Sequence, residues 1–309
     1  MNKKILITAD IDNYIQHRFE ELGYCVDVKP NIERTELLAI ISTYEVLIIT
    51  TYTKVDKILI DTASNLKIVG RVGSGMENVD IEYCKQKKIA CLNSPEGNGN
   101  AVGEHCLATL LNLLNNINKA NNELKNNLFL REENRGEELD EKTIGIIGYG
   151  HTGQAFAKKL RGFEVNILVY DKYREALDTF VRNVSLDELQ MSSDIISFHV
   201  PYNKETHHYC DAAFLKKCTK HPIIINTSRG AVINTIDILN GLETKDITGL
   251  CIDVFEDEPI TKNKIHTNET YQKLFSYKNV IATPHIAGWT HQSKYKLSKI
   301  LMDKIELFL

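Results

Sequence analysis

The chain has 309 residues, of which 43% are apolar and 25% are charged, and its formal net charge is −4. This length exceeds one ordinary core and predicts two globular domains of about 150 residues each. The slight negative charge argues against nucleic acid or a membrane surface as the main partner. No apolar run approaches the roughly 20 residues that a membrane-spanning helix needs, so we expect a cytoplasmic protein.

The cysteines are odd in number, scattered, and form no C-x-x-C pair. We therefore expect buried, reduced thiols and no nucleophile or disulfide framework among them. They are Cys25, Cys84, Cys91, Cys106, Cys210, Cys218 and Cys251.

Short β-branched runs alternate with amphipathic helical segments almost throughout, which is typical of parallel α/β units. In the first third we expect strands at 5–8, 25–28, 46–50, 68–72 and 89–92, with helices at 14–22 and 34–42. One long helix should then cover 101–125. A second series of strands follows at 143–148, 165–171, 194–199, 223–227, 249–253 and 280–282. The polar segment 261–276 is expected to be an irregular surface excursion, and a last helix should follow Thr290.

The segment TIGIIGYGHTGQAFAKKL places Gly148, Gly150 and Gly153 as G-x-G-x-x-G between a predicted strand and a predicted helix. This is the context that a dinucleotide-binding motif requires. The first glycine permits a tight turn, the second allows a pyrophosphate to approach, and the third allows helix and strand to pack closely. The helix N-terminus offers free N–H groups to the phosphates. We therefore predict a nucleotide cofactor.

The strand NILVYD ends in Asp171, about twenty residues after the glycines, where an acid would bind the ribose hydroxyls. A carboxylate there would repel a 2′-phosphate, so the sequence favours NAD over NADP. Lys172 and Arg174 lie nearby, and a solvated acid at the end of a strand is the alternative interpretation of Asp171.

Four further stretches lie at predicted strand ends: RVGSGMENVD (71–80), NTSRG (226–230), CIDVFEDEP (251–259) and TPHIAG (283–288). Together with the glycine motif, they resemble the D-isomer-specific 2-hydroxyacid dehydrogenases over nearly the whole chain, in motif order. The resemblance is closest to short D-3-phosphoglycerate dehydrogenases that lack a C-terminal regulatory domain.

The resemblance implies three catalytic residues. Arg229 matches the arginine that binds the substrate carboxylate and polarises its carbonyl. Glu258 matches the carboxylate paired with the catalytic histidine, and His285 matches that histidine. The chemistry agrees: a guanidinium anchors a carboxylate with two parallel hydrogen bonds, and an imidazolium beside a carboxylate can donate a proton. Taken singly, each could instead be structural: an arginine–acid bridge, a solvated acid or a capping histidine.

The resemblance also implies a cofactor site and a substrate site. Asp253 matches the acid that contacts the nicotinamide amide, and His199 is expected to pack on the cofactor side instead of catalysing. The remaining expected cofactor-binding residues are His151, Thr152, Val200, Pro201, Thr206, Thr227 and Ser228. The expected substrate-binding residues are Ser74 and Gly75, whose loop cradles the carboxylate, together with Asn98 and Lys54. No metal site is expected, and His151, His207 and His208 are interpreted as solvated.

The substrate is less defined than the reaction. Enzymes of the phosphoglycerate subgroup usually carry an arginine for the substrate phosphate after the third strand. Here the chain has Thr50–Lys54, in which only Lys54 is basic. We expect 3-phosphoglycerate and 3-phosphohydroxypyruvate as the substrate pair, with glycerate or lactate as the alternative. A third hypothesis, from a different class, is an NAD-sensing, corepressor-like binding protein.

The domain boundaries follow from the plausible hinges at Gly97–Asn98 and Gly288. Residues 1–98 and 289–309 are expected to form a discontinuous, flavodoxin-like substrate (catalytic) domain. Residues 99–288 are expected to form an NAD-binding Rossmann domain. By analogy with the family, helix 101–125 should lie at the two-fold interface of a homodimer, because its apolar positions spread wider than one domain-facing stripe. These positions are Val102, Leu107, Leu110, Leu111, Leu113 and Leu114.

Overall fold

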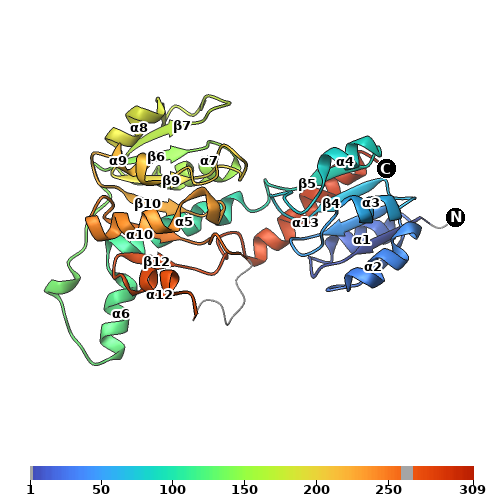
Figure 1. Cartoon of the computed structure of the whole chain (residues 1–309), viewed down its shortest axis with the longest axis horizontal. Coiled ribbons are helices and arrows are strands. Elements are labelled where there is room, and N and C mark those ends of the chain that lie inside the picture. The colour runs from blue at the N-terminus through green and yellow to red at the C-terminus, as the bar shows by residue number, and fades with distance from the viewer. Residues whose placement is uncertain (1–2, 259–266) are drawn as a thin grey trace. The chain divides into compact units, whose positions relative to one another are not determined.

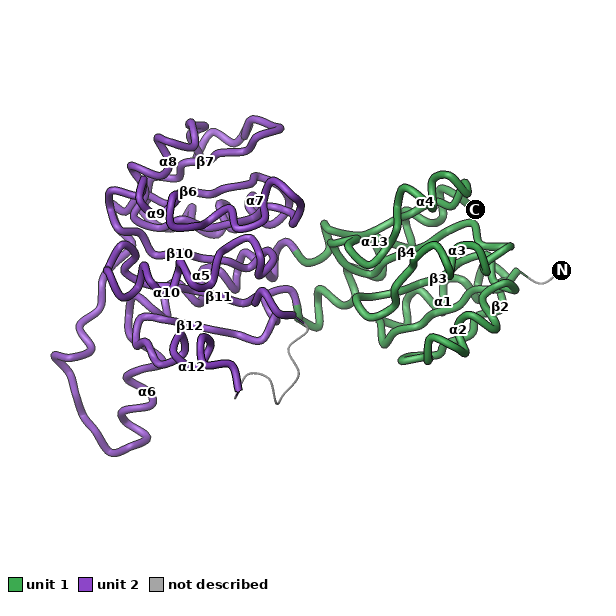
Figure 2. The backbone as a smooth tube through the Cα atoms, in the orientation of Figure 1, with its two compact units in different colours: residues 1–98, 289–309 green, residues 99–288 purple. Residues whose placement is uncertain are grey.

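The computed structural model describes residues 3–258 and 267–309 of the chain. The chain divides into two compact units (Figure 2). Unit 1 comprises residues 1–98 and 289–309, and unit 2 comprises residues 99–288.

Unit 1 contains a five-stranded, fully parallel sheet in the order β2-β1-β3-β4-β5. Figure 1 labels β4 and β5 of this sheet and the helices of the unit. The strands are β1 (Lys4–Ile7), β2 (Cys25–Val28), β3 (Val46–Ile49), β4 (Ile68–Arg71) and β5 (Ala90–Asn93). The helices are α1 (Tyr14–Glu21), α2 (Arg34–Ile40), α3 (Lys57–Thr62), α4 (Ile81–Gln86) and α13 (His291–Glu306). The sequence alternates apolar runs with helices because both faces of such a sheet must be covered.

The two faces of this sheet carry separate cores. Leu6, Leu47 and Val69 pack with α2, α3 and α4, whereas Ile5, Ile7 and Ile48 pack with α1 and α13. Helix α13, from the C-terminal end of the chain, packs on the sheet of unit 1 and completes one of its two cores. A Cβ on Gly70 would lie only 2.8 Å from Ile48 Cδ1 and 3.1 Å from Ile305 Cδ1, so glycine permits this close approach.

Unit 2 contains a seven-stranded parallel sheet in the order β12-β11-β10-β9-β6-β7-β8. The strands are β6 (Thr143–Ile147), β7 (Asn166–Tyr170), β8 (Arg182–Asn183), β9 (Ile195–Phe198), β10 (Ile223–Asn226), β11 (Gly249–Ile252) and β12 (Val280–Ala282). One face packs on α5 (Gly99–Leu114) and α7 (His151–Leu160). The other packs on α8 (Leu186–Ser192), α9 (Ala212–Lys216), α10 (Thr235–Thr244) and α12 (Glu269–Ser276). The predicted architecture of two parallel α/β sheets is confirmed.

Two predicted elements differ from the structure, and one strand was not predicted. The helix predicted at 101–125 is broken into α5 and α6 (Ile117–Lys125), because Asn116 takes the left-handed conformation with φ +52°. The segment 261–276, predicted to be irregular, contains α12, whose Tyr271 and Leu274 are buried in the core; its residues 261–266 lie outside the described part. The two-residue edge strand β8 was not predicted.

The cysteines and the helices can be compared with the expectations of buried thiols and of no membrane-spanning helix. Five of the cysteines are buried, but Cys25 is exposed and Cys91 is half-buried, so the expectation of uniformly buried thiols is wrong for these two. Among the described residues, no helix combines the length and the apolar character that crossing a bilayer requires.

Candidate active site in unit 2

The three candidate catalytic side chains follow three neighbouring strands. Arg229 comes after β10, Glu258 after β11 and His285 after β12. Because parallel strands end at the same edge of a sheet, all three loops emerge at the carboxyl edge of unit 2. Ligands of open α/β sheets bind at this edge.

The structure brings His285 and Glu258 into direct contact. The Nδ1 atom of His285 is hydrogen-bonded to Oε2 of Glu258. The other carboxylate oxygen of Glu258 accepts a hydrogen bond from the backbone N–H of Phe255 at 2.8 Å. The carboxylate therefore fixes the orientation of the imidazole and leaves Nε2 to meet a substrate. The side chain of His285 is 50% exposed, so that nitrogen is accessible.

Asp253 organises the loop that carries His285. Its carboxylate, 1% exposed, accepts hydrogen bonds from Thr283 Oγ1 at 2.5 Å and from the N–H groups of Ile286 and Ala287 at 2.9 and 2.7 Å. Its backbone carbonyl accepts from the N–H of His285 at 2.8 Å. His285 has φ +55°, an uncommon conformation for a residue with a side chain. The bonds to Asp253 hold the loop in that conformation.

Arg229 lies in extended backbone between Ser228 and Gly230. Its carbonyl accepts a hydrogen bond from Asn226 Nδ2 at 3.0 Å, and its Nη1 donates to the carbonyl of Ser228 at 2.7 Å. The adjoining Gly230 packs on the next loop: a Cβ there would lie 2.0 Å from the carbonyl carbon of Phe255. The loops bearing Arg229 and Glu258 are thus in backbone contact.

The glycine motif joins β6 to α7 with a separate role for each glycine. Gly148 has φ +90°, and a Cβ there would lie 2.5 Å from the carbonyl oxygen of His199. A Cβ on Gly153 would lie 2.2 Å from the carbonyl oxygen of Gly148. A Cβ on Gly150 would meet no atom within 4 Å, so the space in front of the helix N-terminus is open. These are the turn, the close packing and the open approach that a pyrophosphate site requires. His151 and Thr152 begin α7 beside this opening.

Asp171 follows β7, next to the glycine motif. Its Oδ2 accepts a hydrogen bond from the N–H of Tyr149 at 2.7 Å, and its Oδ1 accepts from the N–H of Tyr173 at 2.9 Å. These bonds fix the carboxylate beside the motif. The neighbouring Lys172 is paired with Glu205 at 2.6 Å, which partly neutralises a cation that could attract a 2′-phosphate.

The loop after β9 is stabilised by hydrogen bonds between its own residues. Val200 is half-buried and Pro201 is exposed. Thr206 donates to the carbonyl of Pro201 at 2.7 Å and accepts from the N–H of Asn203 at 2.8 Å, so its hydroxyl closes this turn. After β10, Thr227 is hydrogen-bonded to the Cys106 thiol at 3.3 Å, and Ser228 donates to Asn226 Oδ1 at 2.8 Å.

His199 is buried and neutral. Its ring contacts Ser197 Oγ at 2.8 Å and Thr152 Oγ1 at 3.2 Å. Burial lowers the pKa of His199 to about 3. A group with this pKa does not exchange protons near neutrality, so its side chain positions Thr152 and the glycine motif.

The pKa of His199 makes stability depend on pH. The unfolded chain takes up a proton on this residue below about pH 6.5, whereas the folded chain does not do so until about pH 3. Stability should therefore fall as the pH decreases between these two values. Thermal unfolding should show a shallower pH dependence in His199→Asn than in the parent chain. An unchanged dependence would mean that the pKa of His199 is the same in the folded and unfolded states.

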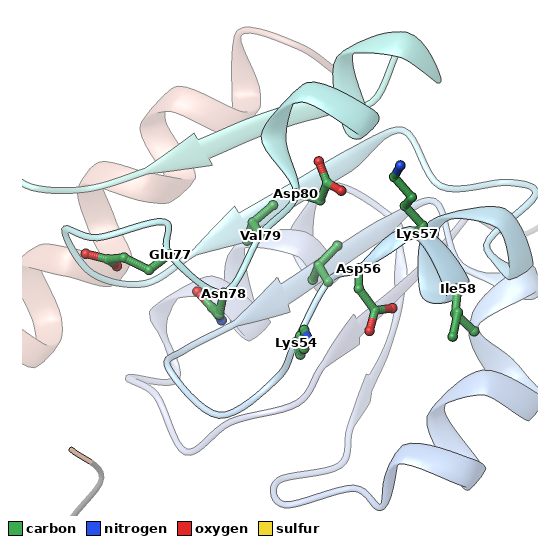
Figure 3. A pocket seen from close by; sticks show the side chains of 9 residues that line it. Lys54, Asp56, Lys57, Ile58, Glu77, Asn78, Val79 and Asp80 are labelled. Atoms are coloured by element: carbon green, nitrogen blue, oxygen red, sulfur yellow. The ribbon is translucent and has the colours of Figure 1, made fainter. Parts of the chain in front are cut away.

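The substrate-binding residues expected in unit 1 fall into two groups. Ser74 Oγ donates to Asn98 Oδ1 at 3.0 Å, and Asn93 Nδ2 donates to the carbonyl of Ser74 at 2.5 Å, so Ser74, Gly75 and Asn98 lie together at the carboxyl edge of this sheet. Lys54 instead lines a separate pocket with Asp56 and Glu77 (Figure 3). The full lining is Lys54, Val55, Asp56, Lys57, Ile58, Glu77, Asn78, Val79 and Asp80.

Arg71 opens the motif RVGSGMENVD and is a further candidate, to which the sequence alone assigns no role. It ends β4, is 9% exposed, and donates from Nη2 to Thr51 Oγ1 at 3.3 Å. A Cβ on Gly73 would lie 2.2 Å from its Nη1, so the guanidinium lies against the loop of Ser74 and Gly75. Arg71 could have been found from the sequence, because it is a charged residue within an apolar strand and charged residues are rarely buried unless they are paired.

His207 and His208 were interpreted as solvated, which is wrong for His208. Its Nε2 is paired with Glu256 Oε2 at 2.6 Å, and its side chain is 32% exposed. His207 is exposed and stacks on it, with ring centroids 4.0 Å apart. Among the described residues, no group of three His, Cys, Asp or Glu side chains could hold a metal ion.

Residues 107–287 match the family model described as the NAD binding domain of D-isomer specific 2-hydroxyacid dehydrogenases. Hydroxypyruvate reductase of Thermotoga maritima is 34% identical over 89% of this chain and 88% of its own length. Glyoxylate reductase of Thermococcus litoralis is 33% identical over 100% of this chain and 94% of its own length. D-3-phosphoglycerate dehydrogenase of Archaeoglobus fulgidus is 32% identical over 98% of this chain but 56% of its own length. The chain thus spans about half the length of such phosphoglycerate dehydrogenases.

Solved structures agree with these matches. D-lactate dehydrogenase from Aquifex aeolicus, complexed with NAD and lactic acid, is 26% identical with a TM-score of 0.85, covering 99% of this chain and 95% of its own. D-2-hydroxyisocaproate dehydrogenase is 25% identical with a TM-score of 0.86, covering 99% of this chain and 96% of its own.

Proposed function

Because this chain belongs to the D-isomer-specific 2-hydroxyacid dehydrogenase family, we propose that it interconverts a three-carbon D-2-hydroxy acid and its 2-keto acid with NAD. The observation that carries the proposal is the hydrogen-bonded pair of His285 and Glu258 at the carboxyl edge of a sheet that also presents the glycine motif. We assign residues 99–288 to NAD binding and residues 1–98 with 289–309 to substrate binding.

His285 is the proton donor in this proposal. NADH, held at the glycine motif, would supply the hydride for C2 of the keto acid. The oxygen on C2 gains negative charge, and Nε2 of His285 delivers the proton that neutralises it. Glu258 stabilises the imidazolium before the transfer, because its carboxylate contacts Nδ1. In the reverse direction, the same nitrogen accepts the hydroxyl proton.

Arg229 anchors the substrate carboxylate. A guanidinium can bind a carboxylate through two parallel hydrogen bonds, which orients the carbonyl for hydride transfer. Within unit 1, we assign Ser74 and Gly75 to substrate binding. We assign the glycine motif to the pyrophosphate of NAD and Asp171 to the ribose. Asp253, expected from the sequence to contact the nicotinamide amide, is buried and supports the loop of His285.

The leading substrate candidate is 3-phosphohydroxypyruvate, with 3-phosphoglycerate in the reverse direction. Two cations in unit 1 support a second anionic group on the substrate. Arg71 lies against the Ser74–Gly75 loop, and Lys54 lies in the loop after β3. Asp56 and Glu77 line the same pocket as Lys54, and their negative charges oppose the binding of a phosphate there.

The second candidate is the unphosphorylated hydroxypyruvate. It is favoured by the 34% identity with the hydroxypyruvate reductase of Thermotoga maritima. The two candidates separate in one assay, since kcat/KM for phosphohydroxypyruvate and for hydroxypyruvate can be measured side by side with NADH.

Replacing Asp171 should change the cofactor preference. Asp171→Ala removes a charge that repels a 2′-phosphate and an acceptor for the ribose hydroxyls, so we expect the NADH/NADPH ratio of kcat/KM to fall roughly 10- to 100-fold. Steady-state kinetics with both cofactors measure this ratio. Glu175→Ala, at an exposed acid in the same loop, is the matched control. An unchanged ratio in Asp171→Ala would show that another residue recognises the ribose.

We further propose a homodimer that forms through the region of α5 and α6. Leu107, Leu111 and Leu113 on α5 are only partly buried within the chain. Ile117 and Leu124 on α6 are 56% and 58% exposed, and Phe129 beyond it is 84% exposed. Light scattering at micromolar concentration should give about twice the chain mass of 35.1 kDa. A monomer would contradict the assignment.

A further inference from the structure

The ion pair of His208 and Glu256 joins the loop after β9 to the loop after β11, which carries Glu258. His208 lies between β9 and α9, far in sequence from Glu256, which follows β11. Their Nε2 and Oε2 atoms are 2.6 Å apart, and the two side chains are 32% and 24% exposed. Glu256 comes two residues before Glu258, and the segment bonded to His208 comes directly after Arg229.

The backbone of the His208 segment is paired with the segment that follows Arg229. The N–H of His208 donates to the carbonyl of Ala231 at 2.7 Å, and the N–H of Cys210 donates to the carbonyl of Val232 at 3.0 Å. The N–H of Asn234 returns a bond to the carbonyl of Cys210 at 3.0 Å. Any displacement of the His208 segment would therefore move the end of the Arg229 loop.

The carboxylate of Glu256 links the His208 segment to the start of α10. Its Oε1 accepts a hydrogen bond from the N–H of Thr235 at 2.7 Å, while its Oε2 meets His208. Burial opposes ionisation of Glu256, but the bonds from Thr235 and His208 outweigh it and lower the pKa of the carboxyl. Glu256 thus holds a negative charge between the two loops.

The conformation of His208 also indicates a constrained position. Its φ is +50°, in the left-handed region that residues with side chains seldom adopt. Such a conformation persists when the surrounding structure determines it, and it is concentrated at functional sites. The bond to Ala231 and the pair with Glu256 supply that constraint.

We propose that His208 and Glu256 are positioning residues, which hold the loops of Arg229 and Glu258 in register for binding and reduction of the keto acid. Neither residue touches the reacting atoms in this scheme. The inference rests on the proposed function for its kinetic consequences, and its structural consequence can be measured without turnover. An ordinary surface ion pair would have little effect on either.

The kinetic test compares His208→Ala with His207→Ala, a control at the exposed neighbouring imidazole that does not contact Glu256. A hydrogen bond to a charged group has an effect of about ten- to a hundredfold, so we expect kcat/KM for the 2-keto acid to fall by that factor in His208→Ala. The Kd for NADH should change less than kcat/KM, because the glycine motif and Asp171 lie outside these loops. His208→Gln, which retains a donor, should recover most of the loss.

The structural test measures amide hydrogen exchange in residues 229–235 and 255–258. Exchange in both segments should increase in His208→Ala and in Glu256→Gln, and should be unchanged in the His207→Ala control. If the parent chain reduces no 2-keto acid but exchange increases as described, the proposed function fails while the positioning role stands. A loss in kcat/KM below about threefold with unchanged exchange, or an equal loss of NADH affinity, would overturn the positioning role.

Discussion

His285→Ala should lower kcat for 2-keto acid reduction by about 10²–10⁴-fold, the usual contribution of a positioned proton donor. The reason is geometric: Glu258 holds Nδ1, so Nε2 is the nitrogen that can protonate the substrate oxygen. NADH binding should persist, since the glycine motif and Asp171 lie on other strands of the sheet. Stopped-flow or steady-state absorbance of NADH gives kcat, and fluorescence titration gives the Kd for NADH.

The control for this experiment is His17→Ala, at an exposed histidine on α1. It should retain parental kcat. Near-parental turnover in His285→Ala would rule out His285 as the acid/base. A parallel loss of NADH binding would instead indicate that the substitution disturbs the loop held by Asp253.

Lys54→Ala should weaken the phosphorylated substrate far more than the plain one if Lys54 reaches the phosphate. Removing one hydrogen bond to a charged group costs about 1.5–3 kcal/mol, so kcat/KM for phosphohydroxypyruvate should fall roughly 10- to 100-fold. The value for hydroxypyruvate should barely change. Added salt should reduce the difference between the two substrates in the parent chain, because it screens the exposed charge.

Lys57→Ala is the matched control, because Lys57 lines the same pocket and lies at the start of α3. If Lys54→Ala affects both substrates equally, Lys54 does not bind the phosphate. If the parent chain prefers hydroxypyruvate, the phosphoglycerate assignment falls and a glycerate- or lactate-type activity replaces it. Tyr52 and Trp289, which are 85% and 81% exposed, would then be candidate pocket walls.

Much of the fold could be predicted because the signals are local and strong. Most of the buried parallel strands are largely apolar, such as β10 with its three isoleucines before Asn226, and their ends were predicted to within a residue or two. The glycine motif could be interpreted before the structure because its spacing reflects three distinct steric demands. His285 and Glu258 were proposed from motifs, and the structure places them in contact.

The remaining differences come from long-range or subtle causes. The break before α6 depends on Asn116 adopting a left-handed conformation, which its neighbours in sequence do not dictate. Helix α12 was predicted to be irregular because its segment is mostly polar, although Tyr271 and Leu274 on one side of the helix are buried. The partner of His208 lies 48 residues away, so no local pattern could reveal it.

The most direct test of the central claim is turnover of the parent chain with NADH and a panel of 2-keto acids: phosphohydroxypyruvate, hydroxypyruvate, glyoxylate and pyruvate. We expect loss of NADH absorbance with at least one of the three-carbon acids and formation of the D-hydroxy acid. Binding of NADH without turnover of any acid in the panel would contradict it, and would favour a dinucleotide-sensing binding protein instead.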